Sequence, residues 1–124
     1  MNLTGTIPDE MNMLDSLQSL SLPFNNLRGK LPSRISQLKS LLSLDVDQNM
    51  LSGSPMDALL SHRTSTTPNE LAVLKLAYNS FESWTIPDGI DAVLPNLQTL
   101  LLQGSSITGS IPIPNTYEAV TDSQ

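Results

Sequence analysis

The residues that most often carry catalysis are scarce in this chain of 124 residues. It contains a single histidine, His62, and no cysteine. His62 lies in a polar stretch over residues 61–69 with no evident partner, so a solvated loop histidine is the simpler interpretation. None of the serines stands in a nucleophile-elbow motif, and the sequence shows no glycine-rich phosphate loop and no cluster of metal ligands. The sequence therefore predicts a protein that is not an enzyme and that uses no cofactor.

Two carboxylates offer the most specific chemistry in the sequence. Asp45 and Asp47 are two residues apart in an alternating segment, so both are expected on the same face of a strand. Such a pair would suit a hard cation, but Ca²⁺ takes six to eight oxygen ligands. Lys75 holds the position of Asp45 in a later, similar segment. This favours a solvated ion pair, worth about 0–1 kcal/mol, and we predict no metal site.

The chain repeats one pattern of hydrophobic residues, and this repeat must position the residues named above. The clearest copy, Leu-x-x-Leu-x-Leu-x-x-Asn-x-Leu-x-Gly-x-Leu-Pro, spans residues 17–32, and related copies span residues 3–8 (partial), 41–53, 71–87 and 97–112. Leu20 and Leu44 hold equivalent positions 24 residues apart. The Leu-x-Leu alternation predicts a short strand with one buried face in each copy. Chance does not keep so many positions in register across four copies, so the pattern predicts stacked structural repeats.

This pattern resembles the plant-type leucine-rich repeat of receptor-like kinase and receptor-like protein ectodomains and of polygalacturonase-inhibiting proteins, over roughly residues 2–112. The resemblance implies a leucine-rich repeat solenoid of the α/β horseshoe class. Short parallel β-strands would line its concave face, and short helical or 3₁₀ turns its convex side. We expect an array over residues 1–112, with about four full repeats, a partial first repeat and an insertion near residues 56–70, followed by a polar tail over residues 113–124.

The same resemblance assigns structural roles to several residues. In the family, an asparagine at the turn after each strand contributes to a ladder of amides, and Asn25, Asn49 and Asn79 hold this position. The apolar pairs expected in the convex turns are Met11 and Leu14, Ile35 and Leu38, and Ile90 and Leu94.

Three features depart from the regular repeat. Between Leu44 and Leu74 the step lengthens to 30 residues, and the extra residues fall in the polar stretch 61–69, which is expected to form a convex loop. The segment 53–55 lacks the apolar residue before its proline, so a second, side sheet is expected to falter there. Neither end shows a cap, and residues 115–124 are expected to be frayed. We therefore expect further repeats to flank this segment in the full-length protein.

The outward positions of the predicted strands are the best candidates for a functional surface. Strands stack about 4.8 Å apart, so equivalent residues form columns across the concave face. Phe24 and Tyr78 share a column two strands apart, about 10 Å from each other. Exposed aromatic rings beside polar groups are typical binding anchors, although the same rings can simply cover a sheet edge. The predicted ligand-binding residues are Phe24, Asp45, Asp47, Gln48, Lys75, Tyr78, Leu101 and Gln103.

The charge of the chain narrows the kinds of partner. Twelve acidic and six basic residues give a net charge of −6, which disfavours nucleic acid and anionic membrane surfaces because their binding draws on Lys and Arg. No stretch approaches the roughly 20 apolar residues that span a bilayer, and no signal-peptide pattern is visible. Asn2, in the tripeptide Asn-Leu-Thr, matches an N-glycosylation acceptor, which would be used only on a secretory route.

These observations support three functional hypotheses. The leading one is a fragment of a receptor-like ectodomain, extracellular or facing outward from a membrane, that binds a protein or peptide through its concave face. The alternative is a soluble inhibitor of a secreted hydrolase, similar to polygalacturonase inhibitors. A remote alternative is an ice-binding solenoid. Ice binding needs a flat array of identical small residues, whereas the columns of this chain mix charged, aromatic and aliphatic side chains.

Overall fold

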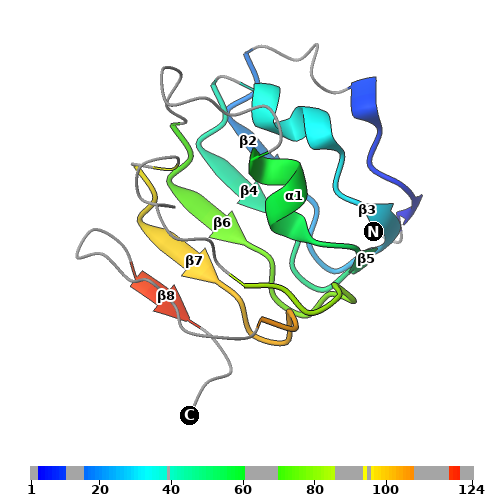
Figure 1. Ribbon diagram of the computed structural model, residues 1–124. Helices are drawn as coiled ribbons and strands as arrows, with labels where there is room; N and C mark the ends of the chain where they lie inside the picture. Colours follow the sequence, from blue (N-terminus) through cyan, green and yellow to red (C-terminus); the bar gives the residue numbers. More distant parts are fainter. Residues whose placement is uncertain are drawn as a thin grey trace.

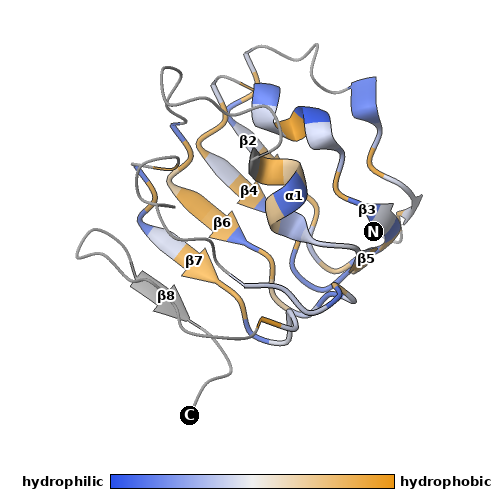
Figure 2. Ribbon diagram, viewed as in Figure 1, coloured by the Kyte–Doolittle hydropathy of each residue, from blue (hydrophilic) through white to orange (hydrophobic). Residues whose placement is uncertain are grey.

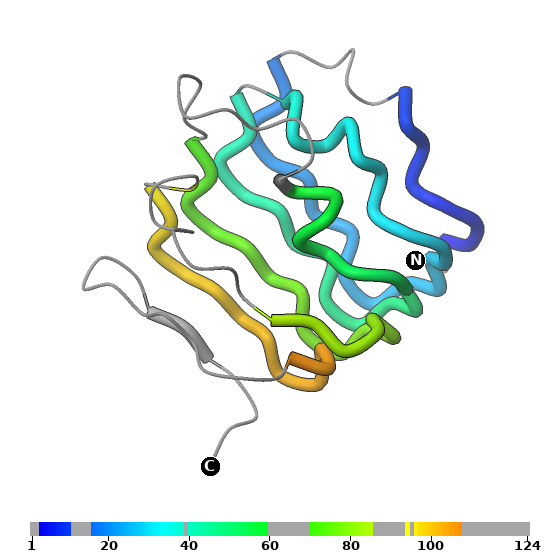
Figure 3. The backbone as a smooth tube through the Cα atoms, viewed as in Figure 1, coloured from blue at the N-terminus to red at the C-terminus, as the bar shows by residue number. Residues whose placement is uncertain are grey.

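The computed structural model describes residues 3–10, 16–38, 40–60, 70–85, 94, 96–107 and 118–120. Within these residues the chain winds in successive coils that lie side by side, each coil being one repeat (Figures 1 and 3). This is the arrangement that the leucine spacing predicts. His62, Asn2, Met11, Leu14 and Ile90 lie outside the described residues.

A five-stranded parallel sheet lines one side of the coils. Its strands, in spatial order, are β2 (Ser19–Ser21), β4 (Ser43–Asp45), β6 (Val73–Lys75), β7 (Thr99–Leu101) and β8 (Glu118–Val120). Leu20, Leu44, Leu74 and Leu100 are aligned from strand to strand, so the register follows the repeat residue by residue. Because side chains alternate along a strand, this register places every first leucine of the pattern on the same, inward face.

The core consists of these inward residues stacked from coil to coil. Leu44, Leu74 and Leu100 are 0% exposed, as are Leu76 and Leu102, which directly follow β6 and β7. Figure 2 shows hydrophobic residues recurring along β4, β6 and β7. Burying a leucine side chain is worth about 1.5–3 kcal/mol, so the stacked spine contributes strongly to the stability of the sheet. The equivalent residues of the edge coil, Leu20 in β2 and Leu22 directly after it, are only partly buried.

A second parallel sheet follows the turn after each of the first strands. It contains β1 (Thr4–Gly5), β3 (Asn26–Lys30) and β5 (Met50–Ser52), in the order β1-β3-β5. The sheet ends at β5, and helix α1 (Pro55–Leu60) begins three residues later. The backbone N–H of Ser80 still donates to Leu51, and an isolated bridge joins Trp84 to Ile107. Among the described residues, the regular side sheet therefore ends at β5, directly before residues 53–55, although the backbone N–H of Glu82 still donates to Gly53.

Short helical segments cover the opposite side of the core. The 3₁₀ helix η2 (Ser33–Gln37) packs against α1. Ile35 and Leu38 are buried, and so is Leu94, the one described member of the last predicted pair. Among the described residues, no helix has the length and apolar character needed to cross a membrane.

The expectation of a frayed tail is wrong for Glu118–Val120. These residues form β8, which pairs in parallel with β7 and places Ala119 opposite Leu100. The physical reason is that the edge of β7 presents unpaired backbone N–H and C=O groups, which any extended segment can satisfy. Because this pairing is made by the backbone, the polar composition of the tail does not prevent it.

Candidate ligand-binding face

The register of the large sheet creates the columns expected on its outer face. Ser21 is paired with Asp45, Asp45 with Lys75, and Lys75 with Leu101. Backbone hydrogen bonds carry the same alignment beyond the strands, because Gln48 donates to Ala77 and Tyr78 donates to Gln103. The predicted ligand-binding residues therefore lie on one continuous face that the described coils share.

One column lies where the chain leaves each strand, and its backbone conformation is unusual. Phe24, Gln48 and Tyr78 each have a φ of 57°, and Gly104 follows with 59°. Residues other than glycine rarely adopt this left-handed region. The conformation repeats because every coil makes the same turn. It directs Phe24 and Tyr78 outward, with exposures of 67% and 53%.

The two carboxylates of the face are bound to the backbone of their own and the next coil. Asp45 Oδ1 accepts the backbone N–H of Asp47 at 3.1 Å, and Asp47 Oδ1 accepts that of Ala77 at 2.7 Å. Burial raises the pKa of Asp47 above its ordinary 3.8, and the Asp45 charge raises it further, while the Ala77 N–H and Lys75 lower it. Both aspartates thus have a structural role that their spacing did not reveal.

The remaining predicted residues are less prominent on this face. Lys75 is half-buried, and it is paired in register with Asp45 on one side and with Leu101 on the other. Its positive charge lowers the pKa of Asp47. Leu101 and Gln103 are also half-buried, whereas Gln48 is exposed. Among the described residues, no group of three or more His, Cys, Asp or Glu side chains is arranged to hold a metal ion.

Asn25, Asn49 and Asn79 form a ladder along the turn that follows the strands. Each side-chain oxygen accepts a backbone N–H from the preceding coil, from Leu3, Leu27 and Leu51 respectively, at 3.0–3.1 Å. The Asn49 Nδ2 also donates to Leu22 of the preceding coil and to Val46 of its own coil. Each carboxamide therefore joins two consecutive coils and satisfies backbone groups that the turn would otherwise leave unpaired.

The ladder is interrupted at Ser105, and the replacement was not predicted. The buried Ser105 hydroxyl donates to Leu102 of its own coil at 2.6 Å. The bond between coils comes instead from Trp84, whose indole Nε1 donates to the Ser105 carbonyl at 2.6 Å. Trp84 is 4% exposed. The sequence signal was available, because serine replaces asparagine in the copy that follows the tryptophan.

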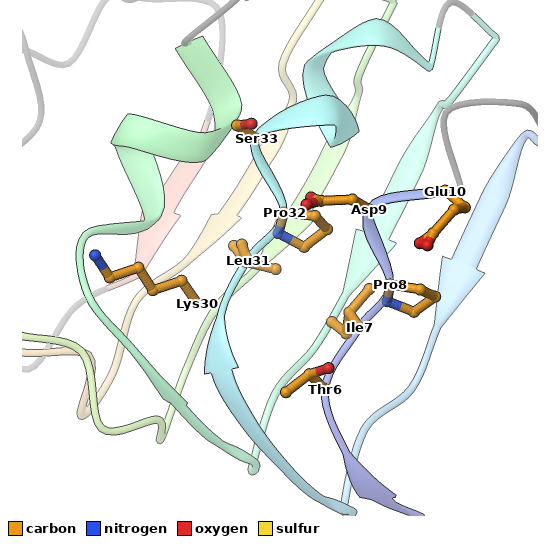
Figure 4. A pocket seen from close by; sticks show the side chains of 9 residues that line it. All are labelled: Thr6, Ile7, Pro8, Asp9, Glu10, Lys30, Leu31, Pro32 and Ser33. Atoms are coloured by element: carbon orange, nitrogen blue, oxygen red, sulfur yellow. The ribbon is translucent and has the colours of Figure 1, made fainter.

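A separate open depression of about 660 Å³ lies on the side of the molecule. It is formed between residues 6–10 and residues 30–33, beside η2 and away from the concave sheet (Figure 4). Lys30 extends away from Asp9 and Glu10 in this view, and its aliphatic stem lies over Gly53. The depression shares no residue with the concave columns.

Comparisons with known proteins agree with this architecture. The family model described as Leucine Rich Repeat matches residues 16–38. None of the curated proteins matches the chain in sequence. The solved plant peptide hormone receptor RGFR1 in complex with RGF2 is 35% identical, with a TM-score of 0.69, over 90% of this chain and 16% of that one.

Two further solved structures come from Arabidopsis thaliana. The leucine-rich-repeat ectodomain of the receptor kinase SOBIR1 is 27% identical with a TM-score of 0.75, over 97% of this chain. A chain of the BIR3–SERK2 complex is 30% identical with a TM-score of 0.72, over 98% of this chain. This chain covers 64% of each of these two proteins, and therefore spans less than two thirds of the structures it resembles.

Proposed function

Because the chain is a leucine-rich-repeat protein of the plant type, we propose that it is a non-catalytic recognition module that binds a peptide or protein segment on its concave face. Similar structures include the plant peptide hormone receptor RGFR1, solved with RGF2, and the receptor kinase HAESA, solved with the peptide hormone IDA. We also propose that the module faces the extracellular side, as an ectodomain does.

One observation carries this proposal. Phe24 and Tyr78 are large aromatic side chains, more than half exposed, in one column of an otherwise continuous sheet face. Aromatic residues with polar neighbours dominate the energy of many interfaces, since they bury a large area and lose few rotamers. An extended peptide lying across the coils would contact both rings, which are about 10 Å apart at the usual strand spacing.

The proposal is tested with a library of random dodecamer peptides displayed on phage and selected on the immobilised chain. We expect enriched peptides to lose binding at least tenfold when Phe24→Ala and Tyr78→Ala are combined, which corresponds to about 1.4 kcal/mol. Arg34→Ala and Asp57→Ala, at exposed positions on the opposite side, serve as matched controls. Peptides that bind equally to the aromatic double variant, or that are lost with the controls, would place binding elsewhere and reject the concave site.

A further inference from the structure

Gly104 differs from Phe24, Gln48 and Tyr78, the other members of its column, in having no side chain. The four residues share one backbone conformation, because the φ of Gly104 is 59° and that of the other three is 57°. Since three of the four are not glycine, this conformation does not by itself require glycine at position 104. The surroundings of Gly104 give a different reason for the missing side chain.

The neighbour of Gly104 is the ring of Tyr78, which belongs to the preceding coil. A Cβ at position 104 would lie 2.6 Å from Tyr78 Cδ1, 3.1 Å from Tyr78 Cε1 and 3.4 Å from Tyr78 Cα. Carbon atoms in contact are normally about 3.5–4.0 Å apart. One edge of the tyrosine ring therefore occupies the space that any side chain at position 104 would need.

The two aromatic residues of the column differ in this respect. The backbone N–H of Tyr78 donates to Gln103 of the next coil at 2.7 Å, and that of Phe24 donates to Asp47 at 3.0 Å, so both backbones are held alike. The residue that follows Asp47, however, is Gln48, which carries a side chain. Tyr78 is less exposed than Phe24, at 53% against 67%. The glycine thus lets the Tyr78 ring, and not the Phe24 ring, lie against the backbone of the next coil.

We propose that Gly104 is a positioning residue of the concave binding face, which holds the Tyr78 ring against the coil of β7 before a ligand binds. Ordering a side chain at an interface is part of the cost of association, and a ring that is already ordered in the free chain avoids this cost. Tyr78 would then be the fixed aromatic anchor of the face. This inference rests on the proposed function and adds to it the residue that orders one of its two rings.

The first measurement concerns the free chain and needs no ligand. NMR should show nuclear Overhauser contacts between the Tyr78 ring and the Gly104 Hα, and couplings of a single χ1 rotamer for Tyr78. Gly104→Ala and Gly104→Asn both add a Cβ, so both should change the ring resonances and the couplings. Asparagine tolerates a positive φ better than alanine, so the pair separates the effect of the Cβ from that of backbone strain. Unchanged ring resonances in either variant would reject the proposal.

Gly53→Ala is the matched control. Gly53 also has a positive φ, of 75°, and a Cβ there would lie 2.9 Å from Lys30 Cγ. It directly follows β5, in the second sheet, and belongs to none of the concave columns. Gly53→Ala should leave the Tyr78 ring resonances and peptide binding unchanged. Equal changes in this control would show a general effect of alanine at a left-handed glycine and would overturn the positioning role.

The second measurement uses the library peptides whose binding depends on Tyr78. Gly104→Ala and Gly104→Asn should each weaken their binding about three- to tenfold, because the ring must be ordered again on binding. In the Tyr78→Ala background the same substitutions should change binding by less than about twofold, since Gly104 acts through the ring. Losses that add fully in the double variants would show that position 104 affects the ligand without the ring, and would reject the positioning role.

The two proposals fail in different ways. Peptides that lose binding with Tyr78→Ala but keep it with both Gly104 variants would support the concave site and reject the positioning role. Peptides that bind the Phe24 and Tyr78 double variant unchanged would reject the proposed function, while the NMR measurements on the free chain still decide whether Gly104 holds the ring. If circular dichroism shows that neither Gly104 variant folds, the ring contacts and χ1 couplings of the native chain decide alone.

Discussion

The first three junctions between coils and the fourth are held by different side chains. At the first three, a carboxamide from Asn25, Asn49 or Asn79 joins the backbone of two coils. At the fourth, the Trp84 indole reaches forward to the carbonyl of Ser105. At the first three junctions the carboxamide oxygen accepts a backbone N–H, and at the fourth the indole N–H donates to a backbone carbonyl. In both cases a side chain satisfies a backbone group that the turn exposes. What the fold requires at this place is a bond between coils, and more than one residue type can supply it.

The two solutions also differ in the hydrogen bonds that they make. Asn49 accepts one backbone N–H and donates to three carbonyls, those of Leu22, Val46 and Asp47. At the fourth junction, within the part of the chain that the structure describes, the Trp84 indole bonds between coils and the Ser105 hydroxyl bonds within its own coil. We infer that the coil of β7 is held less firmly by polar contacts than the coil of β4.

The largest effect is expected from removing an inner amide of the ladder. Asn49→Ala leaves the buried N–H of Leu27 without its partner, at about 1–3 kcal/mol. It also removes one hydrogen bond from each of the Leu22, Val46 and Asp47 carbonyls, which keep a second donor. We expect a loss of about 3–5 kcal/mol in the free energy of unfolding, measured by urea denaturation.

Two variants serve as controls for this loss. Asn49→Ser keeps a hydroxyl for the bond to Val46, as Ser105 does to Leu102, so it should recover about 1 kcal/mol of the loss. Ser105→Ala should cost only about 1 kcal/mol, since it breaks a bond within one coil. A loss for Asn49→Ala no larger than that for Ser105→Ala would mean that the two kinds of junction are equally strong.

The second-largest loss of stability is expected from removing the indole N–H of Trp84. Trp84→Phe keeps a buried ring but removes the donor to Ser105, and it should cost about 1–3 kcal/mol. Hydrogen exchange should show protection lost at Thr99–Leu101 more than at Ser43–Asp45, because only the fourth junction is weakened. Phe81→Leu, a change in a buried ring of the same segment, is the control for packing. Equal losses of protection in both strands would show that the indole bond has no local role.

The parts of this structure that follow the repeat could be predicted from the sequence. The spacing of leucines determines which residues face inward, so the pairing of Leu20, Leu44, Leu74 and Leu100 was predictable. The columns of the concave face follow from the same spacing, because alternate residues must face outward. The repeat spacing also places Phe24 and Tyr78 in one column, whereas their outward direction comes from the left-handed turn that follows each strand.

The parts that depend on the direction of one side chain could not be predicted. The spacing places Asp47 on the outer face, but not its bond to Ala77 of the next coil. At Ser105 the bond between coils comes from Trp84, whose ring must turn toward the next coil. The spacing of residue types along the sequence does not determine that direction. The strand β8 was missed because its pairing with β7 uses backbone groups, and Ala119 stands where the pattern has leucine.

The smallest effect concerns the junction between the coils of β4 and β6, where Asp47 bonds across the coils in addition to Asn79. Its pKa is raised in the folded chain, mainly by burial, so the unfolded chain ionises at lower pH than the folded one. The contribution of Asp47 to the free energy of unfolding is fully present below its ordinary pKa of 3.8. This contribution is lost as the pH rises through the higher pKa of the folded chain.

Asp47→Asn keeps an oxygen for the Ala77 N–H but cannot ionise. We therefore expect the variant to gain stability relative to the native chain as the pH rises from about 3 to about 7. The gain should stay below about 1 kcal/mol because solvent screens a partly exposed carboxylate. Thermal denaturation across this range measures the difference, and Asp57→Asn on the exposed side of α1 is the control. A variant that becomes relatively less stable as the pH rises would show that the ionised carboxylate strengthens this junction, and that the bond to Ala77 outweighs the burial of the charge.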